Sequence, residues 1–137
     1  MTVTIDAVTA PAFRSQLKHG PSGSELTTEA PKDNGGTGGS FSPTDLVAAA
    51  LASCALTTMA LSASREGIPW GAASARIEKV MSPPPRRIAE LRLEIAMPAE
   101  LPLHVRERFE RIAHECPVAR SLSPEVKLPM IFRYPGN

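Results

Sequence analysis

Residues 42–67 of the chain have the sequence SPTDLVAAALASCALTTMALSASREG, and the fold depends on this stretch. Ser42 is a preferred N-cap residue, Pro43 suits the first helical position, and Asp45 complements the positive end of a helix dipole. Gly67 supplies the left-handed residue that commonly ends a helix. The stretch therefore predicts one long helix, about 36 Å in length at about 1.5 Å per residue.

The middle of this helix carries no charge. From Leu46 to Ser64 the run is uncharged, and its length alone would suit a membrane span. Ala, Ser and Thr dominate it, however, and these residues gain little on entering hydrocarbon. We therefore predict a central helix surrounded by protein on nearly every side, and no membrane partner.

The composition of the chain indicates what kind of protein it is. A length of 137 residues, 42% of them hydrophobic and 21% charged, suits a single domain with a buried core. The net charge is +1 and only 4% of residues are aromatic, so the cationic excess and the stacking platforms of nucleic-acid-binding proteins are missing. We expect one domain over residues 1–137 and no nucleic-acid partner. No secretory leader pattern is present at Met1, which favours a cytoplasmic location.

The segments around the long helix favour strands and a second helix. We predict a hairpin over roughly residues 8–28, and an antiparallel pair over residues 73–81 and 88–97. An amphipathic helix should follow residues 98–102 and end at the Cys116–Pro117 pair, because proline disfavours helical geometry in the residue before it. A short helix over residues 118–122 and a strand near residues 126–134 complete an α+β order without a βαβ repeat.

Two cysteines are the candidates for chemistry. Cys54 and Cys116 lie too far apart for a CxxC motif or a four-cysteine zinc site, and two inert buried thiols are the alternative. Cys116 has an N-cap-like position, where the positive end of the following helix favours a thiolate. Cys54 lies in mid-helix, so its activation would need a cation from elsewhere, and Arg14 and Lys18 are the candidates.

Two further kinds of site are not expected. The glycine-rich segment DNGGTGGS at residues 33–40 lacks a following GK[ST] and a leading apolar strand, so we predict no nucleotide there. His114, Cys116, Cys54 and His19 could in principle hold a metal ion, but positions i and i+2 of a helix point apart. We therefore expect surface histidines, and neither a metal nor a cofactor.

Taken together, these motifs resemble the OsmC/Ohr family. The resemblance is carried by SPTDL at residues 42–46 leading into AAALASC at residues 48–54, and by CPV at residues 116–118 after an amphipathic helix. The glycine-rich lead-in at residues 35–39 adds to it, and the similarity covers nearly the whole chain. It implies an α+β fold in which antiparallel sheets wrap around two long central helices of an intertwined homodimer.

The resemblance also implies a thiol-dependent peroxidase that reduces organic hydroperoxides in oxidative-stress defence. Cys54 would be oxidised to a sulfenic acid, and Cys116 would resolve it as a disulfide. A dithiol reductant would close the cycle, and the Ohr branch suggests a lipoylated protein. The alternative is a non-catalytic protein that binds a small hydrophobic ligand at the dimer interface.

One position departs from the family pattern. In the family a glutamate just after the loop proline orients an arginine against the reactive sulfur, whereas this chain has Thr44, which cannot supply the anionic half of an arginine clamp. Strong peroxidase activity is therefore not assumed. Arg14 is the preferred arginine, with Lys18 as the reserve. Asp45 either substitutes for the glutamate or caps the helix.

Overall fold

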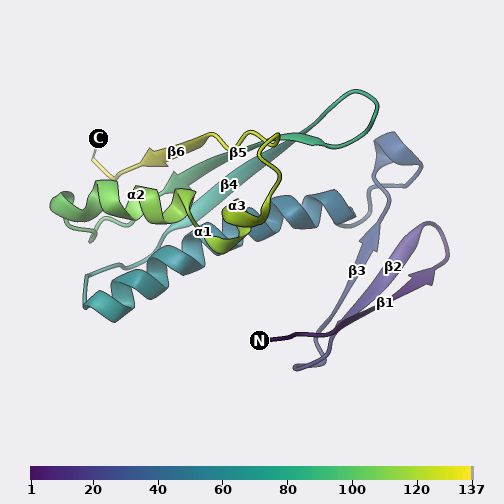
Figure 1. Ribbon diagram of the computed structural model, residues 1–137, viewed down its shortest axis with the longest axis horizontal. Coiled ribbons are helices and arrows are strands. Elements are labelled where there is room, and N and C mark those ends of the chain that lie inside the picture. Colours follow the sequence, from purple (N-terminus) through teal and green to yellow (C-terminus); the bar gives the residue numbers. More distant parts are fainter. Residues whose placement is uncertain (137) are drawn as a thin grey trace. The chain divides into compact units, whose positions relative to one another are not determined.

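A computed structural model describes residues 1–136 of the chain, and it has the α+β architecture expected from the sequence (Figure 1). The chain divides into two compact units, Met1–Val47 and the residues from Ala48 onward, and the division falls inside the long helix α1 (Pro43–Glu66). The single domain expected over residues 1–137 stays a prediction.

The first unit is built on a three-stranded antiparallel sheet. Its strands β1 (Ile5–Ala10), β2 (Arg14–His19) and β3 (Glu25–Glu29) follow one another in the order β1-β2-β3. The predicted single hairpin is therefore wrong by one strand. The turn between β1 and β2 places Ala12 and Phe13 in the left-handed region, at φ 64° and 61°. Glycine is the residue that usually adopts this conformation, and this turn has none, so no local pattern in the sequence marks it.

The long helix α1 begins and ends as its sequence predicts. The Asp45 N–H donates to Ser42 Oγ at 3.1 Å, and the Ser42 N–H donates to Asp45 Oδ2 at 2.9 Å. This reciprocal pair is a capping box, which satisfies two N–H groups at the start of the helix. At the other end Gly67 has φ 65°, in the left-handed region that a non-glycine residue would occupy only under strain.

Only one side of α1 is buried within the chain. The buried positions follow helical spacing: Ala48, Leu51, Ala55, Met59 and Ala63. The opposite stripe is exposed and comprises Ala50, Ser53, Thr57, Leu61 and Ser64. The prediction of a helix surrounded on nearly every side is thus not met within one chain. By length and composition α1 is the one described helix that could cross a membrane, a test that the core helix of a soluble protein also passes.

The second unit contains a mixed sheet. Strands β4 (Ser74–Met81) and β5 (Ile88–Ala96) form the predicted antiparallel pair, and β6 (Met130–Arg133) adds to β5 in parallel. Between β5 and β6 lie the 3-10 turn η2 (Leu103–Val105) and the helices α2 (Arg106–His114) and α3 (Pro117–Ser121). The crossover through these helices is what allows β6 to run parallel to β5.

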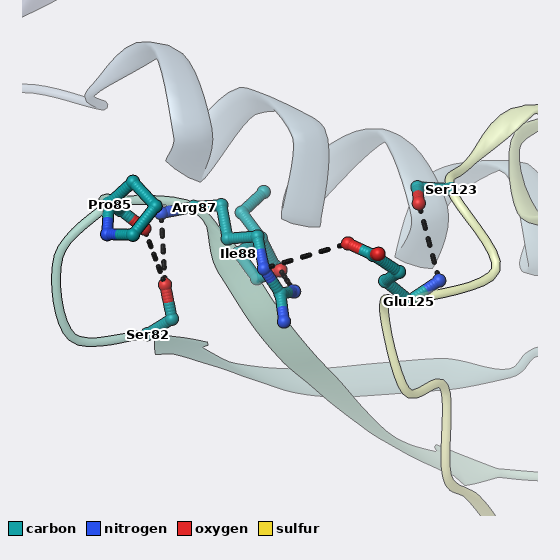
Figure 2. Close-up of polar contacts among 6 residues, drawn as sticks. All are labelled: Ser82, Pro85, Arg87, Ile88, Ser123 and Glu125. Carbon is teal, nitrogen blue, oxygen red and sulfur yellow. Dashed lines mark hydrogen bonds and ion pairs between the residues drawn. The ribbon is translucent and has the colours of Figure 1, made fainter.

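A backbone hydrogen bond from Ser82 to the Arg87 carbonyl closes the turn that joins β4 to β5, and the Ser82 hydroxyl bridges it. Ser82 Oγ accepts from the Arg87 N–H at 3.1 Å and donates to the Pro85 carbonyl at 3.1 Å (Figure 2). The Arg87 guanidinium also lies 3.9 Å from a carboxylate oxygen of Glu125, in the segment that leads to β6. Both partners of this ion pair are exposed, so it contributes little to stability.

Candidate active site

The two cysteines meet within the second unit, although a long stretch of chain separates them. Cys54 lies in the middle of α1, and Cys116 directly precedes α3. Their side chains interact with each other, yet both remain free thiols. Cys116 is fully buried, whereas Cys54 is half-buried. One thiol of the pair is therefore within reach of a small molecule from solvent, and the other is shielded behind it.

The burial of Cys116 follows from the face of α2. Val105, Phe109 and Ala113 are buried at helical spacing along this element, and Cys116 continues the same face one turn later. Pro117 then starts α3, with Cys116 at its N-cap in an extended conformation. The sequence predicts a face of Val105, Phe109, Ile112 and Cys116, and in the structure Ile112 is only half-buried while Ala113 is buried. The helix α2 itself ends at His114.

Burial decides the protonation state of Cys116. Removal from water raises the pKa of the Cys116 thiol, and the neighbouring Cys54 raises it further. Hydrogen bonds from the backbone N–H groups of Ala119 and Val118 lower this pKa, but the net shift is still upward. The expectation that the helix end would make Cys116 a thiolate is therefore wrong, because desolvation outweighs the short helix. Cys116 is a protonated thiol at neutral pH.

A hydroxyl group lies near Cys54. Thr58 Oγ1 lies 3.8 Å from Cys54 Sγ, one helical turn further along α1. Either atom can act as the donor at this distance. The hydroxyl is thus placed to donate a weak hydrogen bond to a Cys54 thiolate.

The two candidate cations lie on β2 in the first unit. Side chains of a strand alternate between the two faces of a sheet, so Arg14 and Lys18 lie on the same face. Arg14 is the register partner of Glu29, and Lys18 that of Glu25. Glu29 is buried, whereas Glu25 is exposed. The two cations therefore face carboxylates in very different environments.

Glu29 is the residue of this region that sequence reasoning missed. Its Oε1 accepts from the N–H and the hydroxyl of Thr37, at 3.2 Å and 2.5 Å, and its Oε2 accepts from the Gly39 N–H at 3.1 Å. The hydroxyl of Thr37 and then its N–H lower the pKa of Glu29, and the charge of Arg14 lowers it further. The sequence pattern that could have indicated Glu29 is its place just before a glycine-rich segment, because the N–H groups of such a segment need an acceptor.

The start of α1 holds the other two positions in question. Thr44 Oγ1 lies 3.2 Å from Ser42 Oγ, and the Asp45 carboxylate accepts from the Ser42 N–H in the capping box. Asp45 therefore caps the helix, and its other expected role, as the substitute for the glutamate, stays a prediction.

The histidines considered as metal ligands have other contacts. His19 Nδ1 lies 2.6 Å from Ser22 Oγ, and the ring of His114 packs against Phe132 with 5.7 Å between centroids. Within residues 1–136, no group of three or more His, Cys, Asp or Glu side chains is arranged to hold a metal ion.

The chain is similar to known proteins over nearly its whole length. The family described as OsmC-like protein matches residues 36–130. A solved structure from Psychrobacter arcticus, described as an osmotic stress induced and detoxification response protein, is 37% identical, with 97% of this chain and 96% of that chain covered and a TM-score of 0.89.

Two more distant structures show the same fold. The organic hydroperoxide resistance protein OsmC of Legionella pneumophila is 21% identical, with 96% of each chain covered and a TM-score of 0.75. OhrB of Bacillus subtilis, an organic hydroperoxide resistance protein, is 15% identical, with 97% of this chain and 98% of that chain covered and a TM-score of 0.71. No functionally curated protein matches the chain.

Proposed function

The chain belongs to the OsmC-like protein family, and on that premise we propose that it is a thiol-dependent peroxidase that reduces organic hydroperoxides. The observation that carries the proposal is the contact between the half-buried Cys54 and the buried Cys116. The structurally similar Legionella and Bacillus proteins are described as organic hydroperoxide resistance proteins, which supports this class of substrate.

In the first step the Cys54 thiolate attacks the distal oxygen of the hydroperoxide. A sulfur–oxygen bond forms, the oxygen–oxygen bond breaks, and the alkoxide leaves and takes up a proton to become an alcohol. The sulfur loses two electrons and becomes a sulfenic acid. Cys54 suits this role because it is the thiol of the pair that solvent can reach.

In the second step Cys116 attacks the Cys54 sulfenic sulfur. A disulfide forms and the sulfenic oxygen leaves as water, with the thiol proton of Cys116 supplying part of it. The contact between the two side chains supports this step, and the raised pKa of Cys116 suits a thiol held in reserve rather than the first nucleophile. A dithiol reductant, such as a lipoylated protein in the cytoplasm, then reduces the disulfide and is itself oxidised to a disulfide.

A cation should keep Cys54 ionised, and we assign this role to Arg14. Its guanidinium stays charged at all physiological pH values and can hold two partners at once. Lys18 is the weaker candidate, because its register partner Glu25 is exposed to solvent. An exposed carboxylate would hold a flexible lysine only weakly.

Thiol counting tests the chemistry. We expect one equivalent of cumene hydroperoxide to remove two free thiols per chain in the wild type and none in Cys54→Ser. Cys116→Ser should complete one turnover and stop as a sulfenic acid that reacts with dimedone. No loss of thiols in the wild type would favour the hydrophobic-ligand alternative, and identical behaviour of the two variants would contradict the assigned roles.

We also infer that the protein acts as a homodimer. Leu61 on α1 is 48% exposed, and on the strands of the first unit Ile5 is 61% and Leu26 47% exposed. The exposed stripe of α1 otherwise consists of Ala, Ser and Thr residues, which allow a second helix to approach closely but gain little from lipid. A second copy of the chain is therefore a better cover than a membrane for the exposed apolar side chains of each unit.

Sedimentation equilibrium tests the dimer. The wild type should have twice the mass of one chain, and Leu61→Glu should shift it toward the mass of one chain, because it buries a charge at the interface. Leu103→Glu is the matched control, since Leu103 is also exposed but lies in η2. A wild type that sediments as a single chain would contradict the inference.

A further inference from the structure

The glycine-rich loop of the first unit encloses a carboxylate of the chain itself. The N–H groups of Thr37 and Gly39 each donate to a different oxygen of Glu29. A Cβ atom at Gly39 would lie 2.8 Å from Glu29 Oε2, and one at Gly36 would lie 1.6 Å from the Ala30 carbonyl oxygen. Gly36 is therefore required for this loop path, because the Ala30 backbone cannot give way, and at Gly39 a side chain would displace the carboxylate that the loop encloses.

The enclosed carboxylate is a fixed negative charge. The Glu29 residue is 2% exposed and accepts three hydrogen bonds, all from loop residues 37–39. A carboxylate offers about four acceptor sites, so one remains for another donor. Because both oxygens are held by the loop, the charge cannot swing away as an exposed glutamate on a strand would.

Arg14 is the cation that this charge faces. Arg14 and Glu29 are direct partners in the β2–β3 ladder, and the charge of Arg14 acts on the Glu29 carboxylate. Side chains opposite each other in an antiparallel pair lie about 5 Å apart at their Cβ atoms, which is within reach of a guanidinium. The exposed Arg14 side chain therefore lies on the same face of the sheet as a fixed negative charge.

The start of α1 supplies no such charge at position 44. That position is a threonine, which has no carboxylate, and its hydroxyl lies beside Ser42 Oγ. A bound carboxylate is needed to orient a guanidinium, because ion pairing with a fixed acceptor removes the rotamer freedom of the arginine.

We propose that Glu29, held by the glycine-rich loop, is the positioning residue for Arg14. This inference rests on the proposed peroxidase function. Glu29 acts only through Arg14 and does not touch the peroxide.

A double-mutant cycle tests the proposal. Glu29→Gln keeps the size and removes the charge, and we expect it to lower kcat/KM for cumene hydroperoxide about tenfold or more, since misplacing a catalytic group by about 1 Å has effects of that order. In an Arg14→Ala background the same change should have no further effect. Glu25→Gln, which alters the exposed carboxylate opposite Lys18, should leave kcat/KM within about twofold of the wild type.

A second variant guards against a folding defect. Thr37→Val removes one donor to the Glu29 carboxylate and keeps its charge, so it should lower kcat/KM by less than Glu29→Gln and again only when Arg14 is present. An equal loss with and without Arg14, for either variant, would show a merely structural role and overturn the proposal. So would an equal loss in Glu25→Gln.

Alkylation separates this inference from the proposed function. In a Cys116→Ser background, the rate of Cys54 alkylation by iodoacetamide as a function of pH reports the thiolate without any peroxide. Glu29→Gln should shift this profile to higher pH with Arg14 present and leave it unchanged without Arg14. A protein that consumes no peroxide but shows this shift would refute the peroxidase function alone, whereas an unshifted profile overturns the role of Glu29.

Discussion

The capping box at the start of α1 permits a quantitative prediction. Ser42 is 1% exposed, and its hydroxyl accepts from the Asp45 N–H at 3.1 Å. Ser42→Ala leaves that N–H without its acceptor at a helix end, and losses of an N-cap oxygen cost about 1 kcal/mol, within about 0.5–2 kcal/mol. Burial of the site places our expectation in the upper half of that range.

The second hydrogen bond of the capping box predicts which of two substitutions at Asp45 lowers stability more. Asp45→Asn keeps an acceptor oxygen for the Ser42 N–H and loses the charge at the helix end, which should cost about 0.3–1 kcal/mol. Asp45→Ala loses the same charge and the acceptor as well, so it should cost about 1 kcal/mol more than Asp45→Asn. Because each half supports the other, the double variant Ser42→Ala/Asp45→Ala should lose less than the two single losses added together.

Urea unfolding at a fixed protein concentration measures these losses, since stability of an associating protein depends on concentration. In thermal unfolding, about 2.1 cal/mol/K per residue converts 1 kcal/mol into a shift of about 3–4 °C for a chain of this length. A loss below about 0.3 kcal/mol for Ser42→Ala, or equal losses for Asp45→Asn and Asp45→Ala, would refute the hydrogen-bond reasoning.

Three further outcomes follow from the packing and the ionised groups. Phe109→Ala should lower the free energy of unfolding by about 3–5 kcal/mol, because Phe109 is fully buried against Trp70, and Leu103→Ala, at an exposed site, by less than about 0.5 kcal/mol. Burial and the Glu110 carboxylate raise the pKa of Tyr134, which is the single tyrosine of the chain. Ultraviolet titration should therefore show phenolate only well above pH 10.0, and a transition near this ordinary value would contradict the buried contact. The pKa of Glu29 in the folded protein lies below the ordinary value of 4.5, so the ionised carboxylate stabilises the fold above that pH. This stabilisation is lost as the pH falls through the lowered pKa. The stability difference between the wild type and Glu29→Gln should therefore narrow in acid.

Local signals carried much of the architecture. The ends of α1 and the strands β4 and β5 were predictable within a residue or two, because caps, glycine stops and period-2 alternation act over a few neighbouring residues. The family resemblance was carried by two short motifs around Cys54 and Cys116, and the matching family and the Psychrobacter structure confirm it.

Other features needed side chains from distant parts of the sequence. The turn at Ala12 and Phe13 has no local signal, since its left-handed residues are imposed by the pairing of β1 with β2 and by a hydrogen bond from Ala30 to the Phe13 carbonyl. The burial of Glu29 was also not predicted, because a glutamate at the end of a strand is normally a solvated residue. Its burial appears only once the loop closes over it.

The sequence by itself determined the long helix, its uncharged length and the identity of two thiols on separate elements, because these depend on composition and on neighbours within a few residues. Tertiary structure alone decided that the two sulfurs meet, that the glycine-rich loop holds Glu29, and that Cys116 is a thiol rather than a thiolate. The physical reason is that pKa values and hydrogen-bond partners depend on which groups displace water around an atom, and in this fold those groups arrive from far along the chain.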